Sequence, residues 1–286
     1  MKELTVISGK GGTGKTSILG SFATLSGKAV ICDCDVDAAN LHLILKPDIK
    51  ETHPFIGGIK AHISSDLCSK CGTCEELCRF SAINDNQVNP YACEGCGLCY
   101  QVCPSGAVQL KEHLSGHWHV SETQWGPMVH AKLGIAEGNS GLLVNVVRKK
   151  AREIAADRNM PLIISDGPPG IGCPVISCLA GTDMALIVTE PTRSGLHDME
   201  RILRVAATFG CVTAVCINKY DLDEENCREI ETSACKLGVP VIGKIPYNQA
   251  LSQSLLRGRP VTQIEENEAA SVIRDLWHQV TLLLGV

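Results

Sequence analysis

The sequence predicts a doubly wound α/β fold, with helices on both faces of a mostly parallel sheet and a small α+β domain inserted into it. Two observations carry this prediction. Short apolar strands alternate with helical segments along most of the chain, as right-handed crossovers require. The alternation stops at about residue 55 and resumes after residue 112, which indicates an insertion rather than a terminal domain. The expected domains are therefore 1–54 and 113–286, forming one sheet, and 55–112, forming the insertion.

The individual elements are predicted from runs of residues between turn signals. Runs rich in β-branched and apolar residues predict strands buried on both faces at Leu4–Ser8, Ala29–Asp33, Leu162–Ser165, Ala185–Thr189, Thr213–Ile217 and Val241–Ile242. Helical periodicity predicts helices at Thr16 to about Ser26, Gly141–Arg158, Gly195–Phe209, Glu224–Leu237 and Glu268–Leu284. The glycine-rich stretch 113–139 is expected to be the return connection from the insertion, with room for a β-ribbon.

The composition is that of a globular protein, with 44% hydrophobic and 20% charged residues among 286. A net charge of −5 gives no reason to expect nucleic acid or an anionic membrane as a partner. No apolar run approaches the ~20 residues that span a bilayer. The last predicted helix lacks a basic face and is expected to pack in the core. With no signal-peptide pattern at its start, the chain is expected to be cytoplasmic, without direct membrane insertion.

Residues 9–16 form a glycine-rich loop between the first strand and the first helix. Glycines let backbone N–H groups turn toward phosphates, and the helix dipole adds positive potential there. Lys15 is expected to reach the β- and γ-phosphates, and the Thr16 hydroxyl to ligate Mg²⁺. The alternative is a plain glycine turn with incidental lysines. The predicted nucleotide-binding residues are Gly9, Lys10, Gly11, Gly12, Thr13, Gly14, Lys15, Thr16 and Ser17.

Acidic residues end two of the predicted buried strands. Asp166 follows Leu162–Ser165, where a carboxylate beside the loop is suited to hold Mg²⁺ directly or through water. The Gly-Pro-Pro-Gly after it suits a segment that senses the γ-phosphate. Asp33, Asp35 and Asp37 close the second strand. Any one of these three could simply cap a helix, but three acids in five residues point to a function.

With its extra Lys10, the loop resembles the deviant Walker A motif of the MinD/ParA/nitrogenase-iron-protein superfamily of P-loop ATPases. The resemblance implies that Lys10 crosses a dimer interface to the other subunit's nucleotide, and that Asp35 positions the attacking water. The stretch from Asp166 is similar to the Walker B and switch II region of the Mrp-like branch, and Asn218 to the adenine-reading element. ATP is then the expected nucleotide. The implied catalytic residues are Lys10, Lys15 and Asp35, and the implied magnesium ligands Thr16, Asp35 and Asp166.

Sixteen cysteines suggest metal or redox chemistry in a reducing compartment, and eight of them fall between Cys68 and Cys103. Their spacing is that of bacterial ferredoxins twice over, in which each fourth cysteine serves the other cluster. The first [4Fe–4S] cluster is expected on Cys68, Cys71, Cys74 and Cys103, and the second on Cys93, Cys96, Cys99 and Cys78. A pair of zinc sites is the alternative. Pro104 follows the second run, but Arg79 replaces the usual proline after the first.

Of the remaining cysteines, Cys173 lies seven residues after Asp166. That offset resembles the switch II cysteine of the nitrogenase iron protein, which helps bind a cluster bridging two subunits. The second cysteine of that protein would fall near Ala136–Gly138, where this chain has none, so a packed residue is the alternative. Cys34, Cys211 and Cys216 are expected in the core. Cys178, Cys227 and Cys235 are expected on helices, without a role.

Together these features resemble MinD-superfamily ATPases with an inserted 2[4Fe–4S] ferredoxin domain. The leading hypothesis is an ATPase, slow without a partner, in which nucleotide-dependent dimerisation is coupled to electron transfer through two clusters. The alternatives are an ATPase that assembles or carries an Fe–S or metal cofactor, and a MinD/ParA-like positioning ATPase whose clusters sense redox state. The expected cofactors are ATP, Mg²⁺ and two [4Fe–4S] clusters. The expected partners are a second copy or a similar paralogue, and a protein redox or cofactor-assembly partner.

Overall fold

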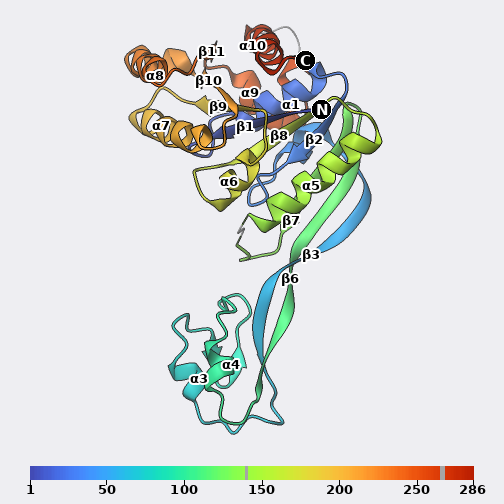
Figure 1. The fold of residues 1–286 in the computed structure, drawn as a ribbon, viewed down its shortest axis with the longest axis vertical. Helices are drawn as coiled ribbons and strands as arrows, with labels where there is room; N and C mark the ends of the chain where they lie inside the picture. The colour runs from blue at the N-terminus through green and yellow to red at the C-terminus, as the bar shows by residue number, and fades with distance from the viewer. Residues whose placement is uncertain (139–140, 265–267) are drawn as a thin grey trace. The chain divides into compact units, whose positions relative to one another are not determined.

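A computed structural model describes residues 1–138, 141–264 and 268–286. The chain divides into two compact units. The larger contains Met1–Thr52, Trp118–Lys132 and the described residues from 141 to Val286, and the smaller contains His53–His117 and Leu133–Gly138. The smaller unit overlaps the expected insertion 55–112 and also takes in a later segment, 133–138, that returns to it (Figure 1).

One sheet of nine strands runs through the described chain in the order β11-β10-β9-β1-β8-β2-β7-β6-β3. The pairs from β11 to β7 are parallel, as predicted for a mostly parallel sheet. The strands are β1 (Lys2–Ser8), β2 (Ala29–Asp33), β3 (Asp48–Ile63), β6 (Val108–Thr123), β7 (Gly126–Leu133), β8 (Leu162–Pro169), β9 (Met184–Thr189), β10 (Val212–Asn218) and β11 (Val241–Ile245).

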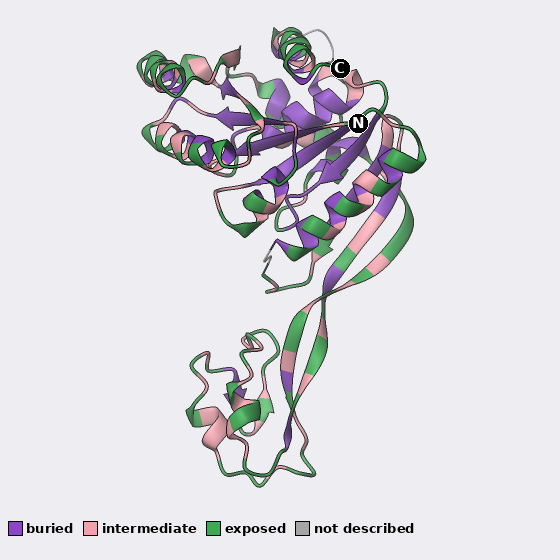
Figure 2. Cartoon of the chain, viewed as in Figure 1, coloured by how far each residue is buried: buried purple, intermediate pink, exposed green. Residues whose placement is uncertain are grey.

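Helices cover both faces of the parallel strands, because alternate strand residues point to opposite faces. On β9, Leu186 and Val188 join one apolar core, and Ala185 and Ile187 join the other. Figure 2 shows the central strands of the sheet coloured as buried. The first core contains residues of α1 (Lys15–Leu25), α2 (Leu41–Leu45), α9 (Gln249–Arg257) and α10 (Glu268–Leu284). The second contains residues of α6 (Cys173–Leu179), α7 (Arg193–Ala207) and α8 (Glu224–Lys236), and α5 (Leu142–Asp157) contacts β2 and α6.

The six predicted strands and five predicted helices are all present, with small shifts at their ends. One shift matters for the site: β8 does not end at Ser165 but continues through Asp166 to Pro169, because Pro169 still pairs with Ser8 of β1. The helices α2 and α9 were not predicted, and α6 was predicted only in so far as Cys178 was expected on a helix. α2 and α6 are only 5 and 7 residues long, too short to show a clear helical period.

The return connection contains a β-ribbon, as the sequence allowed. Gln124 and Trp125 join β6 to β7 in a two-residue hairpin, which requires the two strands to be antiparallel. The side chain of Thr123 bonds the backbone of the turn at Trp125 N, 3.1 Å, and Gly126 O, 2.8 Å. β7 then pairs in parallel with β2, so the ribbon extends the sheet beyond β2.

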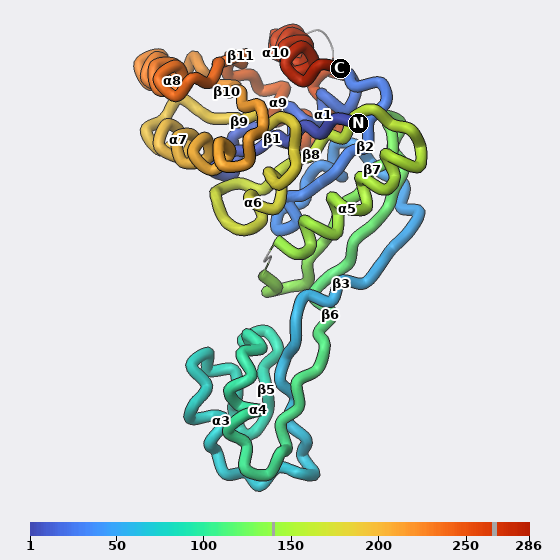
Figure 3. The backbone as a smooth tube through the Cα atoms, viewed as in Figure 1, coloured from blue at the N-terminus to red at the C-terminus, as the bar shows by residue number. Residues whose placement is uncertain are grey.

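The smaller unit holds parts of β3 and β6, which are neighbours in the sheet and are joined by the cysteine-rich segment (Figure 3). That segment contains α3 (Thr73–Glu76), α4 (Leu98–Val102) and a two-stranded sheet of β4 (Ile83–Asn84) and β5 (Gln87–Val88). Glu137 ties the later segment 133–138 to this unit. Its Oε1 accepts from Lys60 Nζ at 2.6 Å and lies 2.8 Å from His113 Nε2.

The C-terminal helix α10 packs in the first core, as predicted, with Ile273, Leu276, Val280 and Leu284 buried. Among the described residues, no helix combines the length and apolar character needed to cross a membrane.

Candidate functional site

The glycine-rich loop connects β1 to α1 at the carboxyl edge of the sheet, where open α/β folds bind ligands. Gly14 is the N-cap of α1 with φ 92° and ψ 7°, a left-handed conformation that disfavours other residues. A Cβ at Gly14 would also lie 2.4 Å from Asn218 Nδ2. Both the backbone conformation and this close approach therefore disfavour a side chain at position 14. The loop is therefore fixed in a turn in which its backbone approaches a neighbouring strand, as phosphate-binding loops require.

Asp166 lies buried beside this loop, and its carboxylate is not satisfied. Neither of its oxygens has a hydrogen-bond partner of normal geometry among the described residues. Burial raises the pKa of Asp166 to about 6, although Lys15 and the Thr16 hydroxyl act to lower it. A buried carboxylate without partners is costly, and a divalent cation would satisfy it. Asp166 and Thr16 thus fit the predicted Mg²⁺ site by their chemistry.

The acidic segment after β2 lies against the same position. Asp33 is paired in register with Asp166, and it organises the following loop by accepting from Asp35 N at 3.2 Å and Leu41 N at 3.3 Å. Burial, and then the charges of Asp166 and Asp35, raise the pKa of Asp33 well above its usual range. Burial likewise raises the pKa of Asp35, with Lys15 opposing it. Several carboxylates near one lysine make a site that favours a cation.

Asn218, predicted from resemblance to read adenine, contacts the loop itself. Its Nδ2 donates to Thr13 O at 2.8 Å and its Oδ1 accepts from Lys219 N at 3.0 Å. The side chain is only 1% exposed. In this structure Asn218 braces the phosphate loop against β10, and its role with a base stays a prediction.

The structure brings together three charged residues whose pairing the sequence did not indicate. Lys10 Nζ lies 3.1 Å from Glu190 Oε2, and Lys219 Nζ is paired with Glu190 Oε1. Glu190 follows β9 directly, so it stands at the same sheet edge as the loop. Nothing in the local sequence around Glu190 could have identified it, because Lys10 is 180 residues away. Lys10 is therefore held within its own subunit in this structure.

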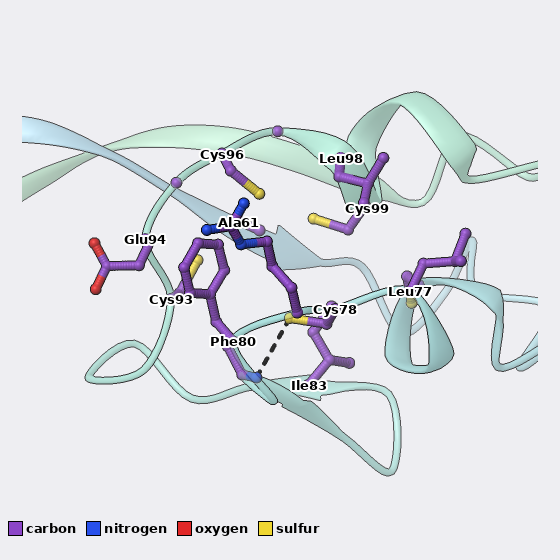
Figure 4. Close-up of a pocket in the computed structure, with 15 residues that line it drawn as sticks. Ala61, Leu77, Cys78, Phe80, Ile83, Cys93, Glu94, Cys96, Leu98 and Cys99 are labelled. Atoms are coloured by element: carbon purple, nitrogen blue, oxygen red, sulfur yellow. Dashed lines mark hydrogen bonds between the residues drawn. The ribbon is translucent and has the colours of Figure 1, made fainter.

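The eight clustered cysteines of the smaller unit line two cavities, one for each predicted ligand set. The first cavity is lined by Cys68, Cys71, Cys74 and Cys103. The second is lined by Cys78, Cys93, Cys96 and Cys99, and also by Cys74, which lines both cavities. Figure 4 shows the sulfurs of the labelled cysteines of the second cavity directed toward a common space. The first cavity thus takes three cysteines from one run and the fourth from the other, and the second takes three from the later run and two from the earlier one.

The two cysteine runs also share local geometry. Gly72 and Gly97 each precede the third cysteine by two residues, and both are left-handed N-caps with φ 77°, of α3 and α4. Backbone amides bond two of the sulfurs, Lys70 N to Cys68 and Ala82 N to Cys78, each at 3.4 Å. Such bonds favour a thiolate, the form that ligates metals. Within the described chain, no group of three or more His, Cys, Asp or Glu side chains is arranged so that it could hold a single metal ion.

The other cysteines divide by burial. Cys34 and Cys216 are fully buried, as predicted, whereas Cys211 is partly exposed. Cys178, Cys227 and Cys235 lie on helices, as predicted. Cys32, to which no role was assigned, has its sulfur 3.4 Å from that of Cys34. Cys173 is exposed as the first residue of α6, after the segment that begins at Asp166, and its role stays a prediction.

Comparison with known proteins agrees with this geometry. An uncharacterized protein of Methanocaldococcus jannaschii is 35% identical over 227 residues, covering 78% of this chain and 80% of its own length. A septum site-determining protein MinD of Neisseria meningitidis is 25% identical over 301 residues, covering 99% of this chain and 91% of its own. In structure, MinD of Pyrococcus horikoshii, solved as a complex with Mg-ADP, superimposes with a TM-score of 0.62 at 19% identity, covering 99% of this chain and 97% of its own.

The family model of the CobQ/CobB/MinD/ParA nucleotide-binding domain matches residues 4–261, which include β1, the glycine-rich loop, both acidic strand ends and Asn218. This span is most of the chain. The protein therefore belongs to the CobQ/CobB/MinD/ParA nucleotide-binding family of P-loop ATPases.

Proposed function

We propose that this chain is an ATPase in which nucleotide-dependent dimerisation controls electron transfer through two [4Fe–4S] clusters held by the smaller unit. The proposal of electron transfer rests on one observation, the distribution of the eight cysteines over two cavities. Each cavity combines three cysteines of one run with cysteines of the other, Cys103 in the first and Cys78 with Cys74 in the second. This mixing is expected for the crossed ligation of a two-cluster ferredoxin. Two independent zinc sites would have no need for the crossed arrangement.

The residues fit such clusters by their chemistry. Cys68, Cys71, Cys74 and Cys103 would hold one cluster, and Cys93, Cys96, Cys99 and Cys78 the other. Bound there, the clusters would supply one-electron redox chemistry. The protein's part is to keep the thiolates charged through amide hydrogen bonds and to surround them with apolar side chains such as Leu77 and Ile83.

The nucleotide half of the proposal depends on the loop and the two acidic segments. Lys15 and the loop amides would bind the phosphates, and Thr16 and Asp166 would hold Mg²⁺. Asp35, buried near Lys15, would orient the attacking water, and Lys10 would reach the nucleotide of a second subunit. The solved Mg-ADP complex of a MinD with the same fold supports this assignment. Hydrolysis would then release the dimer, because ordering of the switch segments depends on the γ-phosphate.

The test is anaerobic purification followed by iron analysis and EPR spectroscopy, with and without ATP. We expect about eight irons per chain, as two cubane clusters require, and an EPR signal or midpoint potential that shifts when Mg-ATP is added. Zinc, or no metal, at the cysteines would overturn the redox half. Cluster potentials and ATP turnover that are indifferent to each other would overturn the coupling.

A positioning ATPase is the second candidate, favoured by the similarity to septum site-determining MinD proteins along 99% of the chain. In that case the clusters would sense redox state, and a protein adaptor would replace a membrane-binding tail. Localisation in cells separates the two candidates. A positioning ATPase is expected to form an ATP-dependent pattern that the Lys15→Ala variant loses, whereas an electron-transfer ATPase is expected to remain evenly distributed.

A further inference from the structure

Three charged side chains meet where adjacent strands β1, β9 and β10 end. Glu190 follows β9, Lys10 lies in the loop after β1, and Lys219 follows β10. Each oxygen of the Glu190 carboxylate has its own lysine: Oε2 lies 3.1 Å from Lys10 Nζ, and Oε1 is bonded by Lys219 Nζ. One carboxylate therefore holds two cations that belong to the surroundings of the phosphate loop.

Both lysines also contact groups next to the nucleotide site. Lys219 Nζ lies 3.5 Å from Gly12 O in the loop, and Lys10 Nζ lies 3.4 Å from Thr192 Oγ1. The Glu190 side chain is only 13% exposed, against 34% for Lys10 and 31% for Lys219. Burial alone would raise the pKa of Glu190, but hydrogen bonds from Lys219 and Lys10 outweigh it and lower that pKa. Glu190 is therefore an anion at neutral pH, in a partly buried ion pair.

The backbone that carries Glu190 is held firmly. Thr189 Oγ1 donates to Gly195 O at 3.0 Å, and Thr192 caps α7 by accepting from Gly195 N at 3.0 Å. The turn between β9 and α7 is thus fastened on both sides of Glu190. A carboxylate on a rigid turn keeps its position when its partners leave, so it acts as a fixed competitor for them.

We propose that Glu190 is a positioning residue that holds Lys10 and Lys219 in the nucleotide-free subunit and competes with nucleotide phosphates for both. The proposal rests on the proposed function, in which Lys10 reaches the nucleotide of a second subunit. For that reach, Lys10 must leave Glu190. Contacts with phosphate oxygens would compensate for the lost ion pair with Glu190, because they offer the lysine more negative charge than a single carboxylate. The pairing with Glu190 thus sets the ATP concentration at which dimers form.

The experiment compares the wild type with Glu190→Gln, which keeps the shape of the side chain and removes its charge. Sedimentation velocity measures the Mg-ATP concentration at half-maximal dimerisation. We expect it to fall about fivefold in the variant, equivalent to about 1 kcal/mol at 1.4 kcal/mol per tenfold. Glu200→Gln is the matched control, because Glu200 lies on α7 and bonds Ser233 Oγ at 2.7 Å, away from the loop. Its midpoint is expected to be unchanged.

A double-mutant cycle with Lys10→Ala distinguishes restraint of Lys10 by Glu190 from a merely structural role of Glu190. If Glu190 acts by restraining Lys10, the effect of Glu190→Gln on dimerisation will shrink when Lys10 is absent. A structural defect would persist in the double variant. A midpoint that stays the same or rises in Glu190→Gln overturns the proposal.

If the proposed function itself is wrong, the result differs from these outcomes, because the wild type then shows no dimerisation with ATP. Glu190 is tested in that case by calorimetric titration of ATP into the subunit. Release of Lys219 is expected to tighten ATP binding by about fivefold in Glu190→Gln, by the same ion-pair estimate. Equal affinities would overturn the role of Glu190 independently of dimerisation.

Discussion

Asp33 and Asp166 occupy paired positions on the adjacent parallel strands β2 and β8, yet only one of them is satisfied. Asp33 accepts from two backbone amides, whereas Asp166 has no hydrogen-bond partner of normal geometry among the described residues. Both are buried, and burial raises the pKa of each. In this pair, Asp33 therefore organises the loop after β2, whereas Asp166 is the proposed ligand of Mg²⁺.

This difference predicts opposite effects of Asp166→Asn on stability and on activity. Without metal, removing an unsatisfied buried charge is expected to raise the free energy of unfolding by about 1–3 kcal/mol. With Mg-ATP, turnover is expected to fall about 100-fold if Asp166 is the magnesium ligand proposed above. Urea unfolding in EDTA and a phosphate-release assay measure the two effects. Asp37→Asn, the same change at an exposed position, should leave stability within about 0.5 kcal/mol. A destabilised Asp166→Asn would contradict this reading.

The crossed cavities predict which irons are lost with each cysteine. Cys103→Ser removes the fourth cysteine from the cavity of Cys68, Cys71 and Cys74, although Cys103 is the last cysteine of the other run in sequence. We expect iron to fall from about eight to about four per chain, with loss of one EPR component and of the magnetic interaction between two clusters. Iron analysis and EPR of the anaerobically purified variant test this.

The matched control is Cys235→Ser, at an exposed cysteine of α8 far along the chain from both runs. Its iron content should equal that of the wild type. Crossed ligation would be wrong if Cys103→Ser kept all of its iron, or if it lost only what a surface cysteine loses.

Much of the site could be predicted because its motifs are local. The loop 9–16 and the two cysteine runs are recognised from spacings of a few residues. Buried strands can be predicted because they are apolar runs. The strand β3 could not be predicted in this way, because residues from Asp48 to Ile63 are mostly exposed or half-buried and include Lys, Glu and Thr. The continuation of β8 past Ser165 was missed for another reason: it depends on the pairing of Pro169 with Ser8.

The contacts that organise the site were beyond prediction because they join distant segments. Nothing in the segment around Glu190 marks it as part of the site, and its importance follows only from its ion pairs with Lys10 and Lys219. That Ser17 binds nucleotide stays a prediction; its hydroxyl donates to Leu251 O of α9 at 3.0 Å, a contact with a helix that was not predicted. Periodicity and spacing describe one segment at a time, whereas these roles follow from the order of strands in the sheet.

A buried ion pair away from the site predicts a large stability effect. Arg148 Nε donates to Glu3 Oε1 at 2.8 Å, and both side chains are nearly inaccessible, at 3% and 4%. Arg148 also donates to Ala180 O at 2.9 Å, linking α5 to the end of α6. Arg152 Nε also donates to Glu3 Oε2 at 2.9 Å, so Glu3 keeps one arginine when Arg148 is removed. Arg148→Met is therefore expected to lower the free energy of unfolding by about 1.5–3 kcal/mol, the range for losing hydrogen bonds to a charged group, because Glu3 Oε1 stays buried without its donor. Urea denaturation monitored by circular dichroism measures it.

Two further variants show whether the charge is responsible. Arg228→Met breaks a pair with Glu224 whose side chains are 74% and 72% exposed, so its cost should be below about 0.5 kcal/mol. Adding Glu3→Gln to Arg148→Met should recover part of the loss, since the buried carboxylate is then gone and Arg152, at 40% exposed, reaches solvent. Losses that simply add would mean that packing, not charge, accounts for the effect.

His130 makes the stability of the larger unit depend on pH. It is 7% exposed on β7, with Ser121 Oγ 2.9 Å from its Nε2. Burial, and then the neighbouring His119 on β6 and His42 on α2, lower its pKa to about 4. In the unfolded chain an ordinary histidine has a pKa of about 6.5. Between these two values the unfolded state binds a proton that the folded state does not, so stability rises with pH from about 4 to about 6.5.

The size of the effect follows from the shift. At about 1.36 kcal/mol for each unit, the histidine should cost roughly 3 kcal/mol of stability at pH 4 relative to pH 7, and nothing above pH 7, where both states are neutral. The measurement is urea unfolding across this range for the wild type and for His130→Gln, which retains a polar group to contact Ser121. Carboxylates titrate in the same range in both proteins, so the difference between the two curves isolates the histidine. That difference should grow as the pH falls from 6.5 to 4; parallel curves would show that His130 is protonated as readily in the folded protein as in the unfolded chain.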